Sequence, residues 1–401
     1  MNKKIIKLFF YFLAPFFLII VYFLRPFVLI RFGVIASQRI GHFAWDTELY
    51  LSNKNYYKYK SFDIFCFTEQ ISNKYLAKLW KRVLFIAPSF ITFPIIRLNE
   101  FISKQLTFAQ KHLIHLKPYD VDNIIFKTKK NLFFLKFEET LGNKILKDNI
   151  ANPEKIVCLI VRDEEYLKKT FPAKDFSYHN YRDCEIDSYI DSVKYLNQLG
   201  YTVIRMGKII KKRMSYSNEK YIEFAECNFF SEFMDIFLAQ KCIFAISSGT
   251  GWEALPAFVF RKPMVFTNFV PFGQLISSSP NFINLAKNHF SEKFQRLLSI
   301  SEIFNLCGTD FESYEKNSIT LRDNTPQEIK SSVQELVEKF LIKKEYSDYE
   351  KHLNNLFWKI FKENIFYSNG VQKKVFGVRC HGKFLARYSV DYLNNNPNFL
   401  K

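Results

Sequence analysis

A short run of small polar residues is the part of the chain whose composition best suits chemistry. Ser248, Gly249, Thr250 and Gly251 directly follow the apolar run 243–246 and a further serine. The glycines allow backbone conformations that other residues avoid and let a ligand approach the main chain, while the hydroxyls can donate to phosphate oxygens. We expect a helix to begin near residue 252 and to direct its free N–H groups at the same point. The pattern predicts a phosphate-binding turn between a buried strand and a helix.

Glu253 stands in the first turn of the expected helix, where its carboxylate is a candidate acceptor for ribose hydroxyls. The loop has neither the Walker A spacing nor the GxGxxG fingerprint, so a nucleoside diphosphate carrying another group suits it better than ATP or NAD. The alternative is an ordinary tight turn in which Glu253 supports the helix dipole.

Basic side chains follow two other strand-like runs. Arg162 closes the apolar run 156–161, while Arg205 lies near the end of the run 201–206 and is followed by Lys208. Ligands of parallel sheets bind at the carboxyl ends of the strands, so these three side chains are candidates to bind a diphosphate. For both arginines the alternative is a structural role, such as a surface pair with a neighbouring aspartate.

The segment 178–183 is polar and aromatic and lies between an expected strand and an expected helix. Its His179, Tyr181 and Arg182 are suited to hold a sugar or a base through hydrogen bonds and ring contacts. A well-packed surface loop is the alternative.

His42 and Asp46 are the candidates for proton transfer in the first half of the chain. His42 falls where a helix is expected to begin, and its imidazole can act as general base on an acceptor hydroxyl. Asp46, one turn later, either orients His42 or is itself the base, and a capping or core role for His42 is the alternative. The chain shows no His/Cys cluster with ligand spacing, and no metal and no cofactor are expected.

The elements that must position these residues alternate between strands and helices, which predicts an α/β fold with parallel sheets. Expected strands cover 27–35, 62–67, 84–87, 155–162, 201–206, 221–225, 243–246 and 264–267. Expected helices cover 74–81, 100–112 and 230–240, with others beginning near 43 and at Asp187 or Ser188, and more after 335. The predicted domains are a membrane anchor over 1–26, Rossmann-like domains over 27–148 and 149–340, and a basic helical extension over 341–401.

Composition narrows the class of partner. The chain has 401 residues with 46 Phe and 22 Tyr and few Gly or Pro, which indicates a folded protein rather than a disordered one. Its formal net charge of +18 implies attraction to a membrane surface, a nucleic acid or a phosphorylated small molecule. Nucleic acid is disfavoured because no arginine-rich tract or RNA-binding signature is present. The seven cysteines form no CxxC pair, so reduced thiols are expected.

The run 8–24 contains no charged residue and would form a helix of roughly 25 Å, slightly short of a bilayer core of about 30 Å. We therefore expect an N-terminal hydrophobic membrane helix, either spanning or lying in the surface. A buried helix of the soluble fold is the alternative. The basic residues on its two sides are too evenly balanced to indicate an orientation.

Four segments together resemble a bacterial family of glycosyltransferases associated with surface-polysaccharide synthesis. They read RIGHFAWDTELYLS, IVCLIVRDEEYL, FSYHNYRDCEIDSYIDSVKYLNQLGYTVIRMGK and FMDIFLAQKCIFAISSGTGWEALPAFVFRKPMVFTN, and the likeness covers residues 27–275. The resemblance implies a GT-B-like architecture whose second domain binds a nucleotide-sugar donor and whose first binds the acceptor. It makes Arg162, Arg205 and the segment 248–253 donor-site candidates and His42 an acceptor-side candidate. It also implies independence from metal.

These observations lead to a functional hypothesis: transfer of a sugar from a nucleotide diphosphate sugar to a lipid-linked or membrane-proximal glycan acceptor. The expected location is the cytoplasmic face of the inner membrane. Two alternatives remain open, namely an epimerase or hydrolase of the same fold and a non-catalytic scaffold for polysaccharide synthesis.

Overall fold

The computed structural model describes residues 3–117, 119–170, 172, 175, 177–306, 311–364, 367–368, 371–372 and 382–401. The chain forms two compact units: unit 1 comprises Met1–Pro118 and Ile124–Leu135, and unit 2 comprises Tyr119–Asn123 and Lys136–Lys401. The main division thus falls at Lys136, earlier than the predicted boundary after 148. Helix α6 (Lys136–Asn149) accounts for the difference, because it packs against helix α9 of unit 2.

Unit 1 is built on a four-stranded parallel sheet in the order β3-β2-β1-β4. In its central pair, Ile30 lies opposite Phe62 and Ile35 opposite Phe67. The strands are β1 (Ile30–Ile35), β2 (Phe62–Phe67), β3 (Phe85–Ile86) and β4 (Leu113–Ile114). The helices are α1 (Lys3–Leu24), α2 (Ile40–Tyr57), α3 (Lys74–Trp80), α4 (Ser89–Ser103), α5 (Thr107–Gln110) and the 3₁₀ turn η1 (Ile125–Lys127).

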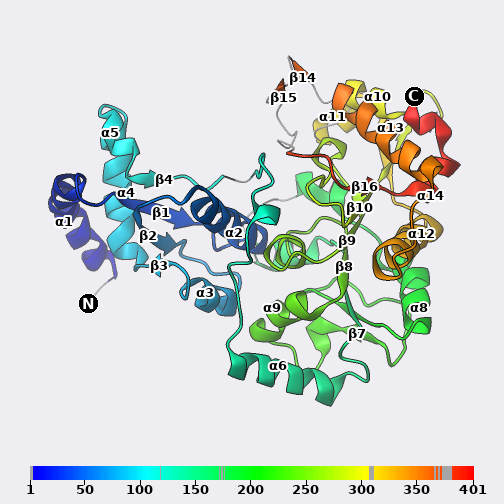
Figure 1. The fold of residues 1–401 in the computed structure, drawn as a ribbon, viewed down its shortest axis with the longest axis horizontal. Coiled ribbons are helices and arrows are strands. Elements are labelled where there is room, and N and C mark those ends of the chain that lie inside the picture. The colour runs from blue at the N-terminus through cyan, green and yellow to red at the C-terminus, as the bar shows by residue number, and fades with distance from the viewer. Residues whose placement is uncertain are drawn as a thin grey trace. The chain divides into compact units, whose positions relative to one another are not determined.

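Helix α1 lies beside α4 in unit 1 (Figure 1). One face of α1, with Ala14, Leu18 and Val21, is buried in a cluster that also holds Ile95 and Ile96 of α4. Within the described residues, no helix has both the length and the apolar character needed to cross a membrane. The predicted span over 8–24 therefore receives no support, and part of α1 belongs to the core of unit 1.

Unit 2 is built on a seven-stranded parallel sheet in the order β16-β10-β9-β8-β5-β6-β7. Its strands are β5 (Ile156–Ile160), β6 (Thr202–Arg205), β7 (Tyr221–Glu223), β8 (Phe244–Ser247), β9 (Met264–Phe269), β10 (Phe282–Ala286) and β16 (Arg387–Tyr388). An antiparallel sheet adds β11 (Asn288–Ser291), β12 (Arg296–Leu297) and β13 (Ile319–Arg322), and β14 (Tyr367–Ser368) pairs with β15 (Val371–Gln372). Because the central strands β5 and β8 are buried along their whole length, they appear in the sequence as continuous apolar runs.

Helices and short turns surround this sheet in Figure 1. Beyond α6 the helices are α7 (Glu165–Thr170), α8 (Ile190–Gln198), α9 (Glu232–Lys241), α10 (Ile300–Leu306), α11 (Phe311–Lys316), α12 (Pro326–Leu336), α13 (Asp348–Asn364) and α14 (Val390–Asn395). The 3₁₀ turns are η2 (Ser177–Arg182), η3 (Ile186–Tyr189), η4 (Phe224–Glu226), η6 (Phe272–Gln274) and η8 (Pro397–Leu400), and π turns are η5 (Leu255–Val259) and η7 (Val337–Leu341).

The segment predicted as a C-terminal extension over 341–401 contributes to the core of unit 2. Strand β16 extends the main sheet by pairing with β10, and the ring of Tyr388 stacks on Phe357 of α13 at 4.3 Å between centroids. Trp358 of α13 donates its Nε1–H to the carbonyl of Ala386 at 2.5 Å. The described part of this segment therefore completes unit 2 rather than standing outside it.

Two helix predictions differ from the structure. The expected helix over 100–112 is α4, which ends at Ser103, followed by the short α5; Leu106 between them has an extended backbone. Most of α4 escaped prediction because Pro94 lies inside it, and proline usually interrupts helices. The helix expected to begin at Asp187 or Ser188 instead begins at Ile190, after η3, and the Ser188 hydroxyl donates to the Glu185 carbonyl instead of capping.

We expect Gly142→Ala to destabilise unit 2. A Cβ atom at Gly142 of α6 would lie 2.3 Å from ring atoms of Phe237, which is fully buried in α9. Displacing this ring should cost about 1–3 kcal/mol, despite the better helix propensity of alanine. Urea unfolding measures the change, and Leu141→Ala, at an exposed position of the same helix, is the control. Equal stability of Gly142→Ala and the wild-type protein would contradict the packing described here.

The carboxyl of Glu335 should make stability depend on pH. Glu335 of α12 is buried, accepts from the Val390 N–H at 2.8 Å and from the Tyr346 hydroxyl at 2.9 Å, and burial raises its pKa from 4.5 to about 7. Because the pKa in the folded state is the higher one, this stabilising contribution is complete below pH 4.5 and is lost as the pH rises through 7. The loss should be on the order of 2–3 kcal/mol. Unfolding measured across this range should show less pH dependence in Glu335→Gln than in wild type, and an unchanged profile would refute the assignment.

Candidate functional site

The turn after β8 has the backbone conformation that its glycines require. Gly249 and Gly251 have φ of 79° and 110°, and a Cβ atom on Gly249 would lie 3.2 Å from the ring of Phe269. The hydroxyl of Ser248 accepts a hydrogen bond from the backbone N–H of Arg162 at 2.8 Å, and this bond joins the turn to the end of β5. The turn thus lies at the carboxyl edge of the unit 2 sheet, beside the end of the neighbouring strand.

The Glu253 carboxylate holds this turn together. Its Oε2 accepts from the N–H groups of Thr250 and Gly251 at 3.0 and 2.6 Å and from the Thr250 hydroxyl at 2.8 Å. The Ser247 hydroxyl also donates to it at 3.3 Å and in turn accepts from the Gly249 N–H at 3.0 Å. These contacts match the structural alternative for Glu253, in which it supports the turn.

The backbone conformation after this turn differs from the prediction. A helix was expected from residue 252, but the observed π turn η5 begins at Leu255 and has five residues. The Ser248 N–H donates to the Ile160 carbonyl and the Trp252 N–H to the Thr250 hydroxyl, and the intervening N–H groups bond to Ser247 and Glu253. In this conformation the backbone donors of the turn are taken, so an anion beside it must be bound by side chains.

Arg162 and Arg182 supply those side chains. Arg182, at the end of η2, donates from Nη2 to the Gly249 carbonyl at 2.7 Å, and Arg162 Nε lies 3.3 Å from Asp183 Oδ1. Within the described residues, the Nε atom of each arginine is buried without a hydrogen bond. Burial lowers the pKa of Arg162, and the charge of Arg182 lowers it further. Arg162 Nε has the ion pair with Asp183 but no hydrogen bond, and Arg182 Nε has no hydrogen bond within the described residues, so these two neighbouring cations make this edge of the sheet attractive to an anion.

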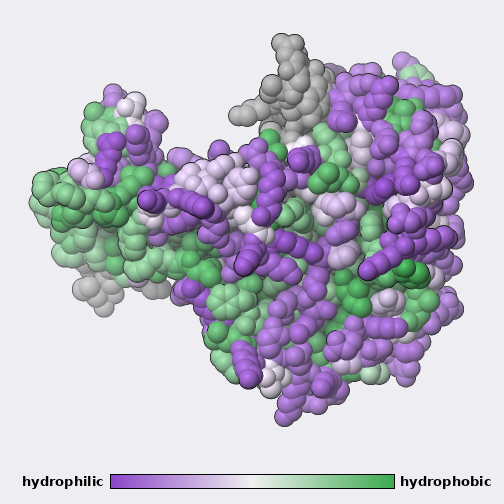
Figure 2. Space-filling model, in the orientation of Figure 1, coloured by the Kyte–Doolittle hydropathy of each residue, from purple (hydrophilic) through white to green (hydrophobic). Residues whose placement is uncertain are grey.

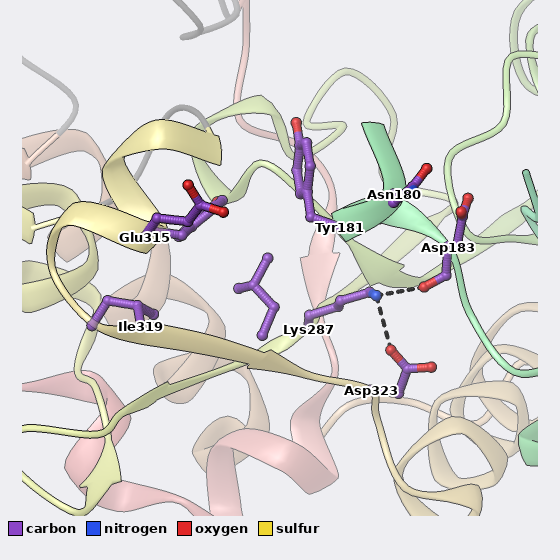
Figure 3. Close-up of a pocket in the computed structure, with 9 residues that line it drawn as sticks. Asn180, Tyr181, Asp183, Lys287, Glu315, Ile319 and Asp323 are labelled. Atoms are coloured by element: carbon purple, nitrogen blue, oxygen red, sulfur yellow. Dashed lines mark hydrogen bonds and ion pairs between the residues drawn. The ribbon is translucent and has the colours of Figure 1, made fainter. Parts of the chain in front are cut away.

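A cavity of about 370 Å³ lies beside this pair and shares Asp183 with it. Figure 3 shows Lys287 extending from the end of β10 between Asp183 and Asp323. Its Nζ donates to the Asp183 carbonyl at 2.6 Å and pairs with Asp323 Oδ1 at 2.9 Å. The cavity is lined by Asn180, Tyr181, Asp183, Lys287, Tyr314, Glu315, Ile319, Leu321 and Asp323. An aromatic ring with carboxylate and amide acceptors suits a base or a sugar.

Sequence reasoning identified part of this cavity and missed the rest. Tyr181 was predicted, whereas Lys287, Asp323 and Glu315 were not, because the strands and helix around them were not predicted. One signal was available: Lys287 follows the apolar run of β10 just as Arg162 follows that of β5. The backbone of His179 lies in η2, but its side chain is outside the described residues.

Arg205 and Lys208 were predicted to bind the donor. Arg205 is buried, and its Nη1 donates to the Lys212 carbonyl at 2.7 Å and contacts Glu223 at 3.3 Å. Lys208 Nζ lies 3.3 Å from Glu232 Oε1. These contacts favour the structural alternative for Arg205, which stabilises the loop after β6.

In unit 1, His42 and Asp46 form a pair on the first turns of α2. The two atoms His42 Nδ1 and Asp46 Oδ2 are 3.1 Å apart, and half of the His42 side chain is exposed. The hydrogen bond to Asp46 raises the pKa of His42, while burial opposes the rise. When Nδ1–H donates to the carboxylate, Nε2 is the ring atom that can accept a proton. The described residues contain no group of three or more His, Cys, Asp or Glu arranged to hold a metal ion.

The cysteines that the structure describes are Cys66, Cys158, Cys184, Cys227 and Cys242, and all five are free. Cys307 and Cys380 lie outside the described residues.

Comparison with known proteins gives a likeness of structure only. No protein-family model and no curated protein sequence matches the chain. The chain is similar to the ADP-heptose lps heptosyltransferase II of E. coli, with 13% identity, a TM-score of 0.34, and coverage of 59% of this chain and 84% of that one. It is also similar to a glycosyl transferase of family 9 from Veillonella parvula, with 10% identity, a TM-score of 0.45, and coverage of 77% and 97%. Both TM-scores are below 0.5, so neither likeness assigns a function to this chain.

We expect Glu253→Ala to destabilise the turn after β8. Loss of Oε2 leaves the N–H groups of Thr250 and Gly251 and two hydroxyls without their acceptor, at a cost of about 1–3 kcal/mol. Urea unfolding measures the loss. Glu253→Gln, which keeps one acceptor oxygen, should lose less, and Glu226→Ala on the surface should change little. If Glu253→Ala were as stable as wild type, Glu253 would have no structural role in this turn.

Proposed function

We propose that unit 2 binds a nucleotide diphosphate sugar and that the protein transfers its sugar to an acceptor hydroxyl. The observation that carries the proposal is the pair of arginines at the edge of the parallel sheet, Arg162 and Arg182, each with a buried Nε that lacks a hydrogen bond within the described residues. A diphosphate supplies both the negative charge and the acceptor oxygens that this pair calls for.

The nucleoside belongs, in this proposal, to the adjoining cavity. Tyr181 offers a ring face to a base, and Asn180, Asp183 and Asp323 offer acceptors and an amide for base or sugar groups. Glu253 is close enough to Arg162 for its carboxylate to raise the pKa of the guanidinium. Since the four bonds that hold the turn all use Oε2, Oε1 is the oxygen that we assign to a ribose hydroxyl.

The proposed reaction is direct displacement at the anomeric carbon. The acceptor oxygen forms a bond to this carbon while the bond from the carbon to the diphosphate oxygen breaks, and the nucleoside diphosphate leaves with the electron pair. Arg162 and Arg182 stabilise the charge on the departing group, which makes the reaction independent of metal in this proposal. His42 Nε2 takes the proton of the acceptor hydroxyl, and Asp46 orients the ring and stabilises the imidazolium.

The acceptor that we propose is a lipid-linked or membrane-proximal glycan of surface-polysaccharide synthesis, used at the cytoplasmic face of the inner membrane. This part of the proposal is supported by the sequence resemblance and by the apolar N-terminal segment. An epimerase or hydrolase would release a product without an acceptor, and a scaffold would bind no nucleotide.

Nucleotide binding tests the donor site first. Titration calorimetry with UDP, GDP, ADP, CMP and dTDP should identify one nucleotide that binds the wild-type protein. Arg162→Gln and Arg182→Gln should each weaken that binding by roughly ten- to a hundredfold, because each removes charge-assisted hydrogen bonds to the diphosphate. Arg213→Gln, which removes an exposed arginine paired with Glu226, is the matched control and should bind normally. Absence of binding to every nucleotide would overturn the proposal.

The pH dependence of transfer tests the base. A histidine base acts when neutral, so the rate should rise with pH through the pKa of His42, which Asp46 raises above 6.5. Asp46→Asn should lower this pKa, shift the rising limb to lower pH and reduce kcat, while Glu100→Gln on the surface of unit 1 should leave the profile unchanged. NMR titration of the His42 ring checks the pKa independently of activity. If the pKa of His42 measured by NMR falls in Asp46→Asn but the rising part of the pH–rate profile does not move, His42 is excluded as the base.

A further inference from the structure

The side of α1 that faces away from α4 carries large apolar side chains in solvent. Its exposed residues recur at helical spacing and form what we call the apolar face: Phe9, Phe12, Phe16, Ile19, Ile20 and Phe23. Phe12 is 73% exposed and Phe23 is 76% exposed, so the face is open to a partner rather than covered by the fold. Figure 2 shows hydrophobic surface gathered over α1, at the left end of the view. Apolar surface of this kind is typical of a binding surface.

The charge of the chain is concentrated in the same unit. Unit 1 has twenty Lys and Arg against five Asp and Glu, a formal net charge of +15, whereas unit 2 has 37 against 34, a net charge of +3. Arg97 on α4, Lys104 directly after it and Lys111 after α5 are exposed, and Phe101 on α4 is exposed as well. Unit 1 therefore combines an apolar helix face with a strongly basic surface.

The apolar face of α1 and the basic charge of unit 1 together indicate which partner binds this face. A second copy of the chain would bring another unit of charge +15 to the interface, and the repulsion would oppose association. A nucleic acid would need basic side chains interleaved with the aromatic ones, but the run 8–24 contains no charged residue. A bilayer with anionic headgroups satisfies both properties, since its acyl region accepts the aromatic and aliphatic side chains and its surface attracts Lys and Arg.

We propose that unit 1 docks on the surface of an anionic phospholipid membrane through the apolar face of α1, with the helix lying in the plane of the interface. One side of α1 is held in the core of unit 1 by Ala14, Leu18 and Val21, and the other enters the headgroup region. This docking goes beyond the proposed transfer reaction and does not depend on it.

Vesicle flotation tests the docking. The full-length protein is mixed with vesicles of phosphatidylcholine alone, or of phosphatidylcholine and phosphatidylglycerol in equal parts. It should float mainly with the anionic vesicles, bind them more weakly at high salt, and dissociate in alkaline carbonate. The variant F12S/F16S/F23S should lose flotation at least tenfold, whereas F294S/Y349S, which changes exposed aromatic residues of unit 2, should float as wild type. Lys104→Gln and Lys111→Gln should each weaken binding to anionic vesicles by about fivefold.

Each other occupant gives a different result. Retention after alkaline carbonate, with no preference for anionic vesicles, would show insertion instead of docking. A dimer in light scattering that F12S/F16S/F23S dissociates would show that a second copy covers the face. Undiminished flotation of F12S/F16S/F23S would overturn the docking surface. Nucleotide binding by the same variant separates the two proposals, because it should match wild type whether or not the membrane is bound.

Discussion

The candidate site depends on how unit 2 tolerates two neighbouring cations that are largely withdrawn from water. Arg162 lies at the end of β5 and Arg182 at the end of η2, and the turn after β8 brings them together through Ser248 and Gly249. Burial and repulsion from Arg182 lower the pKa of Arg162, and the carboxylates of Asp183 and Glu253 offset this only in part. Because an arginine keeps its proton, the remaining cost falls on the site without a ligand. A bound anion removes that cost, and for this reason the arrangement is more informative than a single surface arginine would be.

The role of Glu253 changes how an anion can bind. In many phosphate-binding turns the backbone N–H groups face the ligand, but here Thr250 and Gly251 direct theirs to the Glu253 carboxylate. A carboxylate already occupies the position that a phosphate would take. The turn therefore acts as a rigid support that positions Arg162 and Arg182, while the long guanidinium side chains provide the recognition. The bonds that hold the turn are therefore made within the protein and require no ligand.

The sequence predicted strands β2, β5 and β8, but it missed β10, although that strand is also buried and mostly apolar. It also predicted that Gly249 and Gly251 allow backbone conformations that other residues avoid, and both have positive φ; His42 and Asp46 lie one helical turn apart, as expected. Periodicity cannot show which donors a side chain will use, so the bonds of Glu253 and the enclosure of Arg205 by its own loop required the structure. Other elements were missed because they are short or contain an interrupting residue. Helix α4 contains Pro94, which is unusual inside a helix, and β16 has only two residues.

The unequal charge of the two units gives the two proposed surfaces different physical character. In unit 2, acidic residues nearly balance basic ones, so the field at Arg162 and Arg182 is local and acts on a ligand already at the sheet edge. In unit 1, an excess of exposed basic side chains acts at a distance, but only over a Debye length of about 8 Å at physiological ionic strength. Salt therefore screens the attraction of unit 1 to a membrane far more than it screens contacts made by partly buried guanidinium groups. The apolar face of α1 compensates for this weakness, because burial of Phe12 and Phe23 does not depend on charge.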